Sequence, residues 1–160
     1  MNKNFLLGVC FLLFTTNKKL RLFTVEEQKE KPKLFKEKGM ISPPFETFES
    51  RDENAKGTII RLIEEEIGFS VSQVEIYAVA TEKFNLIPGN DNIFTTYAVG
   101  ILNGDPNQER HPKDTDIVFS GWKTIDELFL CKVRIETRPI IDHFIKNYLP
   151  GILNKFSVTA

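Results

Sequence analysis

The sequence is poor in the residues that build zinc sites and disulfide frameworks. Its 160 residues include two cysteines, Cys10 and Cys131, and two histidines, His111 and His143. No CxxC pair is present and the four residues are scattered, so the spacing of a zinc site is missing. We therefore predict two reduced thiols that contribute to packing, as is usual in a cytoplasmic protein.

The sequence also has almost no net charge. Its 21 basic and 22 acidic residues leave a formal charge of −1, which excludes an overall basic field that would attract long nucleic acids or anionic membranes. An anionic small molecule would need a local site. With 41% apolar and 27% charged residues, the chain has the composition of a folded protein, and its length fits one domain over residues 1–160.

Long apolar runs are missing except for Phe5–Phe14. Because Lys3 precedes it, this run resembles the start of a signal peptide, but Thr15 to Lys19 follow where a small-residue cleavage site should stand. The run is also too short to cross a bilayer. It is typical of a strand buried on both faces, and we predict such a strand in a cytoplasmic protein.

The first half of the chain predicts a β-hairpin and then a helix. The hairpin joins Phe5–Phe14 to Leu20–Val25, and a charged loop over Glu26–Lys38 follows. The helix runs from Asn54, whose side chain is suited to an N-cap, to Ile67, and Gly68 is suited to end it.

The second half alternates strands and helices. Further strands are predicted over Val74–Thr81, Ile93–Leu102 and Ile117–Trp122, a short helix from Thr124, and a last helix that starts at Pro139 and ends at Pro150-Gly151. This order predicts an α/β fold in which helices cover both sides of a mixed β-sheet.

The segment Glu53–Phe69, ENAKGTIIRLIEEEIGF, carries charged residues in a defined order. The order begins with an early glutamate, Glu53, and an arginine, Arg61. Two adjacent glutamates, Glu65 and Glu66, follow, and then a glycine and an apolar residue, Gly68 and Phe69. This pattern resembles the Nudix box, and the flanking strands and helices agree with that family over nearly the whole chain. Two positions depart from the pattern, since Thr47 replaces its first glycine and Leu62 replaces the glutamate after the arginine.

The resemblance implies a Nudix-like α/β/α sandwich. It also implies a hydrolase that uses Mg²⁺ or Mn²⁺ to cleave the diphosphate linkage of a nucleoside diphosphate derivative. Carboxylates a helical turn apart form a patch that suits these hard cations. The implied metal ligands are Glu53, Glu65 and Glu66. The implied catalytic residues are Arg61, which would orient Glu65, together with Glu65, Glu66 and Asp116.

Leu62 removes the middle of this carboxylate patch, because leucine offers no oxygen to a metal. Other acids that could complete the shell are Glu46, Glu49 and, less directly, Glu109. A structural interpretation stays open beside the functional one. In it, the Glu64–Glu66 run is a solvated helix face, Leu62 extends the apolar stripe, and Asp116 is an exposed loop acid.

Two other functions stay open beside hydrolysis. Leu62 and Thr47 favour a catalytically impaired nucleotide-binding or regulatory module that keeps the diphosphate cleft, and a scaffold that contacts another protein is the third hypothesis. For hydrolysis and for the binding or regulatory module, the expected partner is a small-molecule nucleoside diphosphate derivative. Neither membranes nor long nucleic acids are expected, and a homodimer is expected only on the general frequency of dimers.

Overall fold

A seven-stranded mixed β-sheet forms the centre of the computed structural model, which describes residues 5–113 and 117–160. The strand order is β3-β2-β1-β6-β5, with β4 paired to β1 and β7 paired to β2. Strands β1 and β6 run parallel, from Leu6↔Ile93 to Phe14↔Ile101, and the other pairs are antiparallel. The strands are β1 Leu6–Thr15, β2 Arg21–Glu27, β3 Ile41–Ser42, β4 Phe45–Thr47, β5 Val74–Val79, β6 Ile93–Leu102 and β7 Ile117–Lys123.

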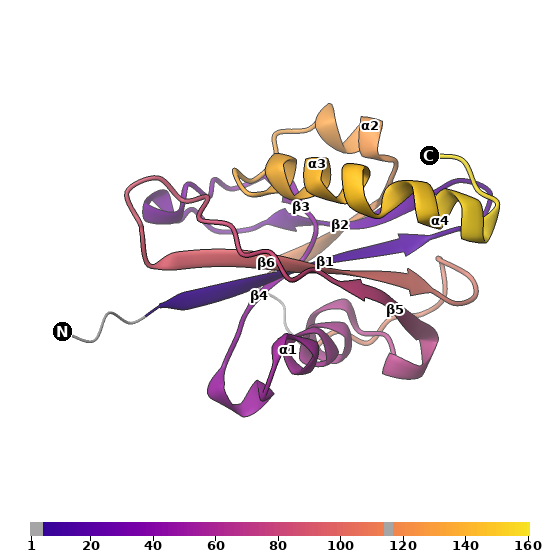
Figure 1. Ribbon diagram of the computed structural model, residues 1–160, viewed down its shortest axis with the longest axis horizontal. Coiled ribbons are helices and arrows are strands. Elements are labelled where there is room, and N and C mark those ends of the chain that lie inside the picture. Colours follow the sequence, from indigo (N-terminus) through magenta and orange to yellow (C-terminus); the bar gives the residue numbers. More distant parts are fainter. Residues whose placement is uncertain (1–4, 114–116) are drawn as a thin grey trace.

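Helices cover both faces of this sheet (Figure 1). One face carries α1, Ala55–Leu62, and the other carries α2, Ile125–Phe129, with α3, Thr137–Asn147, and α4, Leu149–Phe156. The short helical turns are η1 Pro32–Leu34, η2 Ser50–Asp52, η3 Ile63–Ile67 and η4 Val71–Gln73. The predicted α/β/α sandwich with a mixed sheet is therefore confirmed.

Strand β1 lies between two hydrophobic cores, as its continuous apolar run predicts. Cys10, Leu12 and Phe14 belong to the core beneath α3 and α4, and the alternate residues of the strand belong to the core beneath α1. Burial raises the pKa of the Cys10 thiol well above its usual value. Both Cys10 and Cys131 are free cysteines.

The helix predicted from Asn54 to Ile67 is confirmed, with a change of winding in its last turn. The Asn54 side chain accepts a hydrogen bond from the Gly57 N–H at 3.0 Å and caps α1. From Ile63 to Ile67 the helix widens to a π-turn, which closes where the Gly68 N–H donates to the Ile63 carbonyl at 2.8 Å. Gly68 has φ +87°, a left-handed conformation that favours glycine.

The C-terminal helical region differs from the prediction. Helix α3 begins at Thr137, two residues before Pro139, and Pro150-Gly151 does not end it. Instead the chain breaks at Tyr148, and Pro150 lies in the first turn of a new helix, α4, where no intrahelical N–H donor is needed. None of the helices in the described ranges is both long and apolar enough to cross a bilayer.

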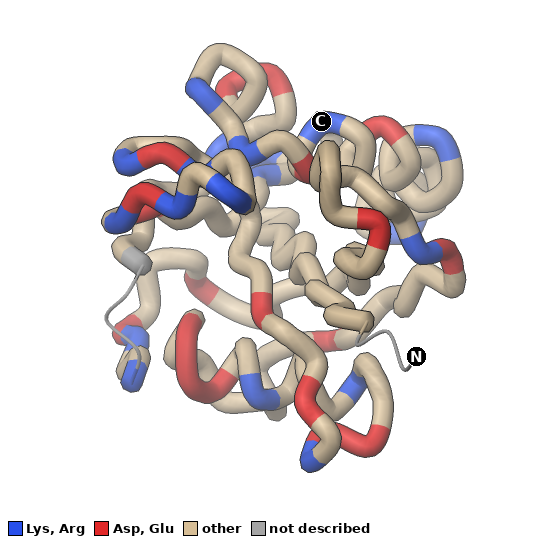
Figure 2. The backbone as a smooth tube through the Cα atoms, turned by 90° about the vertical axis from the view of Figure 1, so that its left-hand side faces the viewer, with Lys and Arg blue, Asp and Glu red and all other residues tan. Residues whose placement is uncertain are grey.

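Charges of the two signs are mixed over the molecule. In the view of Figure 2, lysine and arginine segments lie among aspartate and glutamate segments and do not form a face of one sign. This agrees with the lack of an overall basic field, so recognition of an anion depends on local geometry.

Candidate functional site

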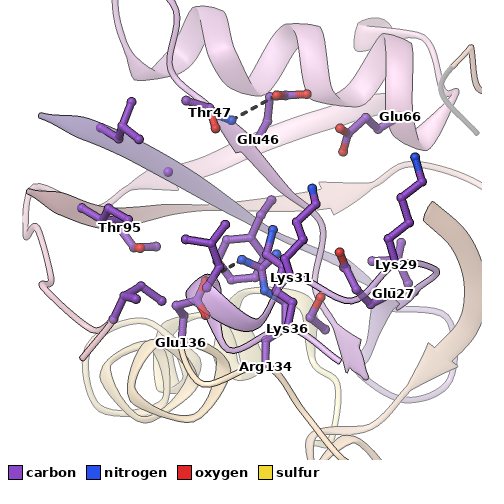
Figure 3. Close-up of a pocket in the computed structure, with 18 residues that line it drawn as sticks. Glu27, Lys29, Lys31, Lys36, Glu46, Thr47, Glu66, Thr95, Arg134 and Glu136 are labelled. Atoms are coloured by element: carbon purple, nitrogen blue, oxygen red, sulfur yellow. Dashed lines mark hydrogen bonds and ion pairs between the residues drawn. The ribbon is translucent and has the colours of Figure 1, made fainter. Parts of the chain in front are cut away.

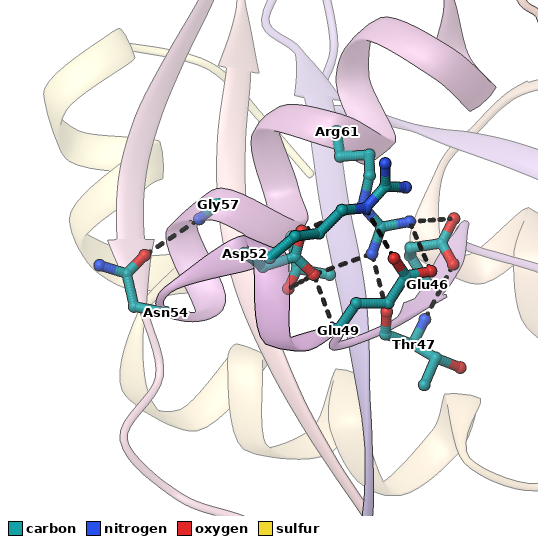
Figure 4. A network of polar contacts seen from close by, with 9 residues as sticks. Glu46, Thr47, Glu49, Asp52, Asn54, Gly57 and Arg61 are labelled. Carbon is teal, nitrogen blue, oxygen red and sulfur yellow. Dashed lines mark hydrogen bonds and ion pairs between the residues drawn. The ribbon is translucent and has the colours of Figure 1, made fainter.

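Arg61 of α1 lies at the centre of a polar network that ties β4 and η2 to the helix (Figure 4). Its guanidinium donates to both carboxylate oxygens of Asp52, from Nε at 3.1 Å and from Nη2 at 2.9 Å. Nη2 also donates to the Thr47 carbonyl at 2.8 Å, and Nη1 lies 3.4 Å from the Glu46 carboxylate. The paired donors of a guanidinium match a carboxylate well, so this pair fixes the start of the helix against the sheet.

Asp52 completes the network from the turn before α1. Its Oδ2 accepts hydrogen bonds from the Glu49 N–H at 2.7 Å and from the Thr58 hydroxyl at 3.0 Å. The Arg61 guanidinium, helped by these two donors, holds the pKa of Asp52 far below its usual value. The reciprocal effect raises the pKa of Arg61, chiefly through its hydrogen bonds to Asp52.

These contacts correct the predicted contact of Arg61. Within the described residues, Arg61 contacts Asp52, Thr47, Glu46 and Glu49 and does not contact Glu65. The reason is geometric, since the guanidinium extends toward the N-terminal turn of the helix, where Asp52 is buried, and Glu65 belongs to the π-turn at the other end. Arg61 therefore orients the loop before the helix.

Leu62 faces the protein interior. Its side chain is fully buried in the core beneath α1, with Ile59 and Ile63 from its own helix and Phe11 from β1 among its neighbours in that core. It does not line the cavity at the amino ends of β1 and β6. The interpretation of Leu62 as an extension of the apolar stripe is therefore confirmed.

The three predicted metal ligands do not come together. Glu53 is exposed and has φ +59° at the end of turn η2, Glu65 is half-buried in the π-turn, and only Glu66 lines the cavity. Asp116 lies outside the described residues. Within residues 5–113 and 117–160, no three His, Cys, Asp or Glu side chains are grouped so that they could hold a metal ion. These residues therefore do not fit the carboxylate site that the resemblance implies.

A cavity of about 320 Å³ opens at the amino ends of the parallel strands β1 and β6 (Figure 3). Strands β1 to β4, β6, turn η3 and the loop after β2 contribute to its wall. The lining residues are Leu6, Gly8, Val25, Glu27, Lys29, Lys31, Leu34, Lys36, Ser42, Phe45, Glu46, Thr47, Glu66, Ile87, Ile93, Thr95, Arg134 and Glu136. A concave site with an apolar part and a few convergent charged groups is typical of a small-molecule site.

Arg134 and Glu136 form the most deeply buried charged pair of this wall. They are 8% and 3% exposed, and Arg134 Nη2 donates to Glu136 Oε2 at 2.5 Å. The guanidinium also lies over the Phe45 ring, 3.9 Å from its centroid. Because its charge is balanced by Glu136, Arg134 contributes less to anion binding than an unpaired cation would.

Lys31 and Lys36 are the cations of the wall that have no such partner. Among the described residues no carboxylate lies within ion-pair distance of either ammonium group. Burial, together with the charges of Arg134 and Lys31, lowers the pKa of Lys36 below its usual value, against the opposing effect of Glu27 and Glu136. The loop that sequence reasoning treated as solvated thus supplies the positive part of the site.

Sequence reasoning missed Asp52, Lys31, Lys36 and Arg134. Asp52 stands one residue before the aligned Glu53, and only the turn conformation decides which of the two carboxylates reaches Arg61. The alternate lysines Lys29 and Lys31, which both line the cavity, were a usable signal, because alternate residues of an extended chain point the same way.

Comparison with known proteins supports the fold. No family model and no curated protein matches the sequence. Among solved structures, the NUDIX domain of Shewanella oneidensis NrtR, complexed with ADP ribose, superposes with a TM-score of 0.68 at 15% identity over 91% of this chain and 89% of that chain. A NUDIX hydrolase from Nitrosomonas europaea gives 0.63 at 19% identity over 93% and 90% of the two chains.

A C. elegans Ap4A hydrolase gives a TM-score of 0.62 at 14% identity, covering 90% of this chain and 98% of that chain. The resemblance that the sequence predicts is thus confirmed at the level of the fold, and at these identities the likeness extends to the fold alone. The chain has the Nudix fold.

Proposed function

We propose that the protein binds a nucleoside diphosphate derivative in the cavity of Figure 3 and hydrolyses it slowly or not at all. The composition of the wall carries this proposal. Lysine side chains face the cavity, whereas only Glu66 of the three expected metal ligands does. Leu62, where a further carboxylate is expected, is fully buried in the core.

The other parts of the wall suit the rest of such a ligand. Leu6 and Ile93 are paired across β1 and β6, and they line the cavity with Ile87 and Thr95. An apolar surface with a neighbouring hydroxyl suits a nucleobase or a ribose. A NUDIX domain of similar fold is complexed with ADP ribose, which makes that compound a reasonable first probe.

Hydrolysis with Mg²⁺ or Mn²⁺ is the second candidate, and one observation favours it. Glu27, Glu46 and Glu66 line the same cavity, together with Glu136, which is paired with Arg134, so carboxylates would face a bound diphosphate. Bound there, a divalent cation would neutralise negative charge on the diphosphate and activate a water molecule. Glu46 is held by the Thr47 N–H at 3.0 Å and by Arg61, which keeps its carboxylate on the wall.

The two candidates are separated by measuring binding and turnover on the same samples. ADP ribose and ADP are titrated calorimetrically into the protein with Mg²⁺, with Mn²⁺ and with EDTA, and each mixture is then assayed for released products. We expect saturable binding and little or no metal-dependent product. Turnover that needs the metal and is lost in the Glu65→Gln, Glu66→Gln double variant establishes the second candidate instead. Absence of binding to any compound by the folded protein contradicts both.

A further inference from the structure

The loop after β2 presents two lysines side by side. The Lys31 N–H donates to the Lys36 carbonyl at 2.9 Å, and the Lys36 N–H donates to the Lys31 carbonyl at 3.1 Å. Turn η1 between them contains Pro32, and Phe35 has φ +57°. Residues that exchange both hydrogen bonds stand directly opposite each other in an antiparallel bridge, with side chains on the same side. Figure 3 shows both side chains at the wall of the cavity.

Two like charges placed directly opposite each other oppose folding. Some other cations are paired with acids, for example Lys155 with Glu75 at 3.0 Å and, in the wall of the same cavity, Arg134 with Glu136. Lys31 and Lys36 have no such ion pair among the described residues, and burial makes the charge of Lys36 harder to hold. An anion with two adjacent negative groups relieves this repulsion when it enters the cavity.

The carboxylates that the resemblance implies as metal ligands are not grouped to hold a metal ion that would neutralise a bound diphosphate. Glu53 is exposed, Glu65 does not line the cavity, and the described residues contain no group of three metal-binding side chains. The carboxylate of Glu46 already interacts with Arg61 and the Thr47 N–H. Positive charge at the cavity therefore comes from the protein's own side chains.

We propose that Lys31 and Lys36 bind the diphosphate group directly and take the charge-neutralising place of a divalent metal ion, a step that rests on the proposed function. The two ammonium groups act as a clamp on the two adjacent phosphates. Charge-assisted hydrogen bonds to phosphate of this kind are among the strong ones in proteins. Binding is then independent of Mg²⁺.

The experiment compares two double variants of the full chain in the ADP ribose titration, in EDTA and in Mg²⁺. Lys31→Met, Lys36→Met removes the facing pair and keeps the apolar stems of both side chains. Lys33→Met, Lys38→Met is the matched control, because it removes the same charge from the same loop at residues that do not line the cavity. Thermal unfolding without ligand checks that each variant folds.

We expect wild-type affinity to differ less than about threefold between EDTA and Mg²⁺. We expect the Lys31, Lys36 double variant to bind at least roughly 100-fold more weakly, since each charge-assisted hydrogen bond contributes about one factor of ten or more. The control should stay within about threefold of wild type. The unfolding temperature of the double variant without ligand should not fall, because a repulsive pair is lost, whereas a merely structural role would lower it.

Other outcomes overturn the inference in distinguishable ways. Binding that appears only with Mg²⁺ refutes charge compensation by lysine and leaves the proposed function standing. Binding in EDTA that survives in the Lys31, Lys36 variant places the cationic contact elsewhere and also refutes it. No binding by wild type in either condition removes the proposed function and this inference together.

Discussion

Replacing Leu62 by glutamate restores the residue that the Nudix box expects, and the structure predicts that the protein does not tolerate it. The Leu62 side chain is 0% exposed and packs in the core beneath α1. A carboxyl group placed there would lie among the apolar side chains of that core. A buried, unpaired carboxyl shifts its pKa upward and becomes neutral instead of carrying charge in the core.

The size of the effect follows from two contributions. Keeping the introduced carboxyl neutral at pH 7, against an unfolded pKa of about 4.3, costs about 3–4 kcal/mol at 1.36 kcal/mol for each pH unit. Burying the neutral group without a hydrogen bond adds about 1–3 kcal/mol. The expected loss of about 4–7 kcal/mol is a large share of the 5–15 kcal/mol that typically stabilises a domain.

The pH dependence of Leu62→Glu identifies the mechanism. Because the pKa of the introduced carboxyl is raised on folding, its penalty is largest above the folded pKa and shrinks as the pH falls toward the unfolded pKa. At pH 5 the first contribution decreases to about 1 kcal/mol. Urea unfolding at pH 7 and pH 5, followed by circular dichroism, measures this difference.

Leu62→Met is the matched control, since a volume-conserving apolar exchange should cost less than about 1.5 kcal/mol. A Leu62→Glu variant that is as stable as wild type at pH 7 and also gains affinity for Mg²⁺ would contradict the burial of residue 62. Residue 62 would then face the cavity, and the metal site would be restorable.

Four further substitutions, one of them a control, test the network at the start of α1 and the charge of the cavity. Asp52→Ala should lower the free energy of unfolding by about 3 kcal/mol, because Arg61 loses its buried partner. Glu53→Ala, an exposed control, should change it by less than about 0.5 kcal/mol. Since the pKa of Asp52 is lowered on folding, its contribution should be present above about pH 4 and diminish as the pH falls further, which urea unfolding at several pH values measures. Gly57→Ala should destabilise the protein although alanine favours helices, because its Cβ would lie 2.0 Å from the Asp52 carbonyl oxygen, and thermal unfolding detects the sign. Because the pKa of Lys36 is lowered, affinity for ADP ribose should fall as the pH rises through that lowered value, below the usual 10.5, and titrations from pH 7 to pH 10 should find this dependence absent in Lys36→Met.

The elements that could be predicted from the sequence are those that local patterns specify. The central strand follows from an apolar run without polar interruption, and α1 follows from an apolar stripe between Asn54 and Gly68. In these segments, side-chain periodicity and backbone capping agree, so tertiary contacts do not have to decide between alternatives.

The parts that could not be predicted depend on contacts between distant residues or on one turn. Turn η2 decides that Asp52 reaches Arg61 and that Glu53 points to solvent, a difference of one residue that an alignment with the Nudix box does not reveal. Lys36 reaches the cavity because its loop folds back on Lys31. The charged sequence of this loop does not predict that fold. Pro150 indicates the end of α3 near Tyr148, but it does not reveal that a second helix, α4, begins at Leu149.

Several predictions from the sequence stay predictions. A cytoplasmic location, a homodimer and the role of Asp116 are among them. The titrations with ADP ribose and ADP test which nucleoside diphosphate derivative binds.

A crystal structure of the protein with ADP ribose, grown in the presence of Mg²⁺, shows whether lysine side chains or a metal ion hold the diphosphate. We expect an intact ligand in the cavity, with its diphosphate between the ammonium groups of Lys31 and Lys36 and its base or ribose against Leu6 and Ile93. A diphosphate bridged by Mg²⁺ to Glu65 and Glu66, or a ligand cleaved in the crystal, would contradict this expectation.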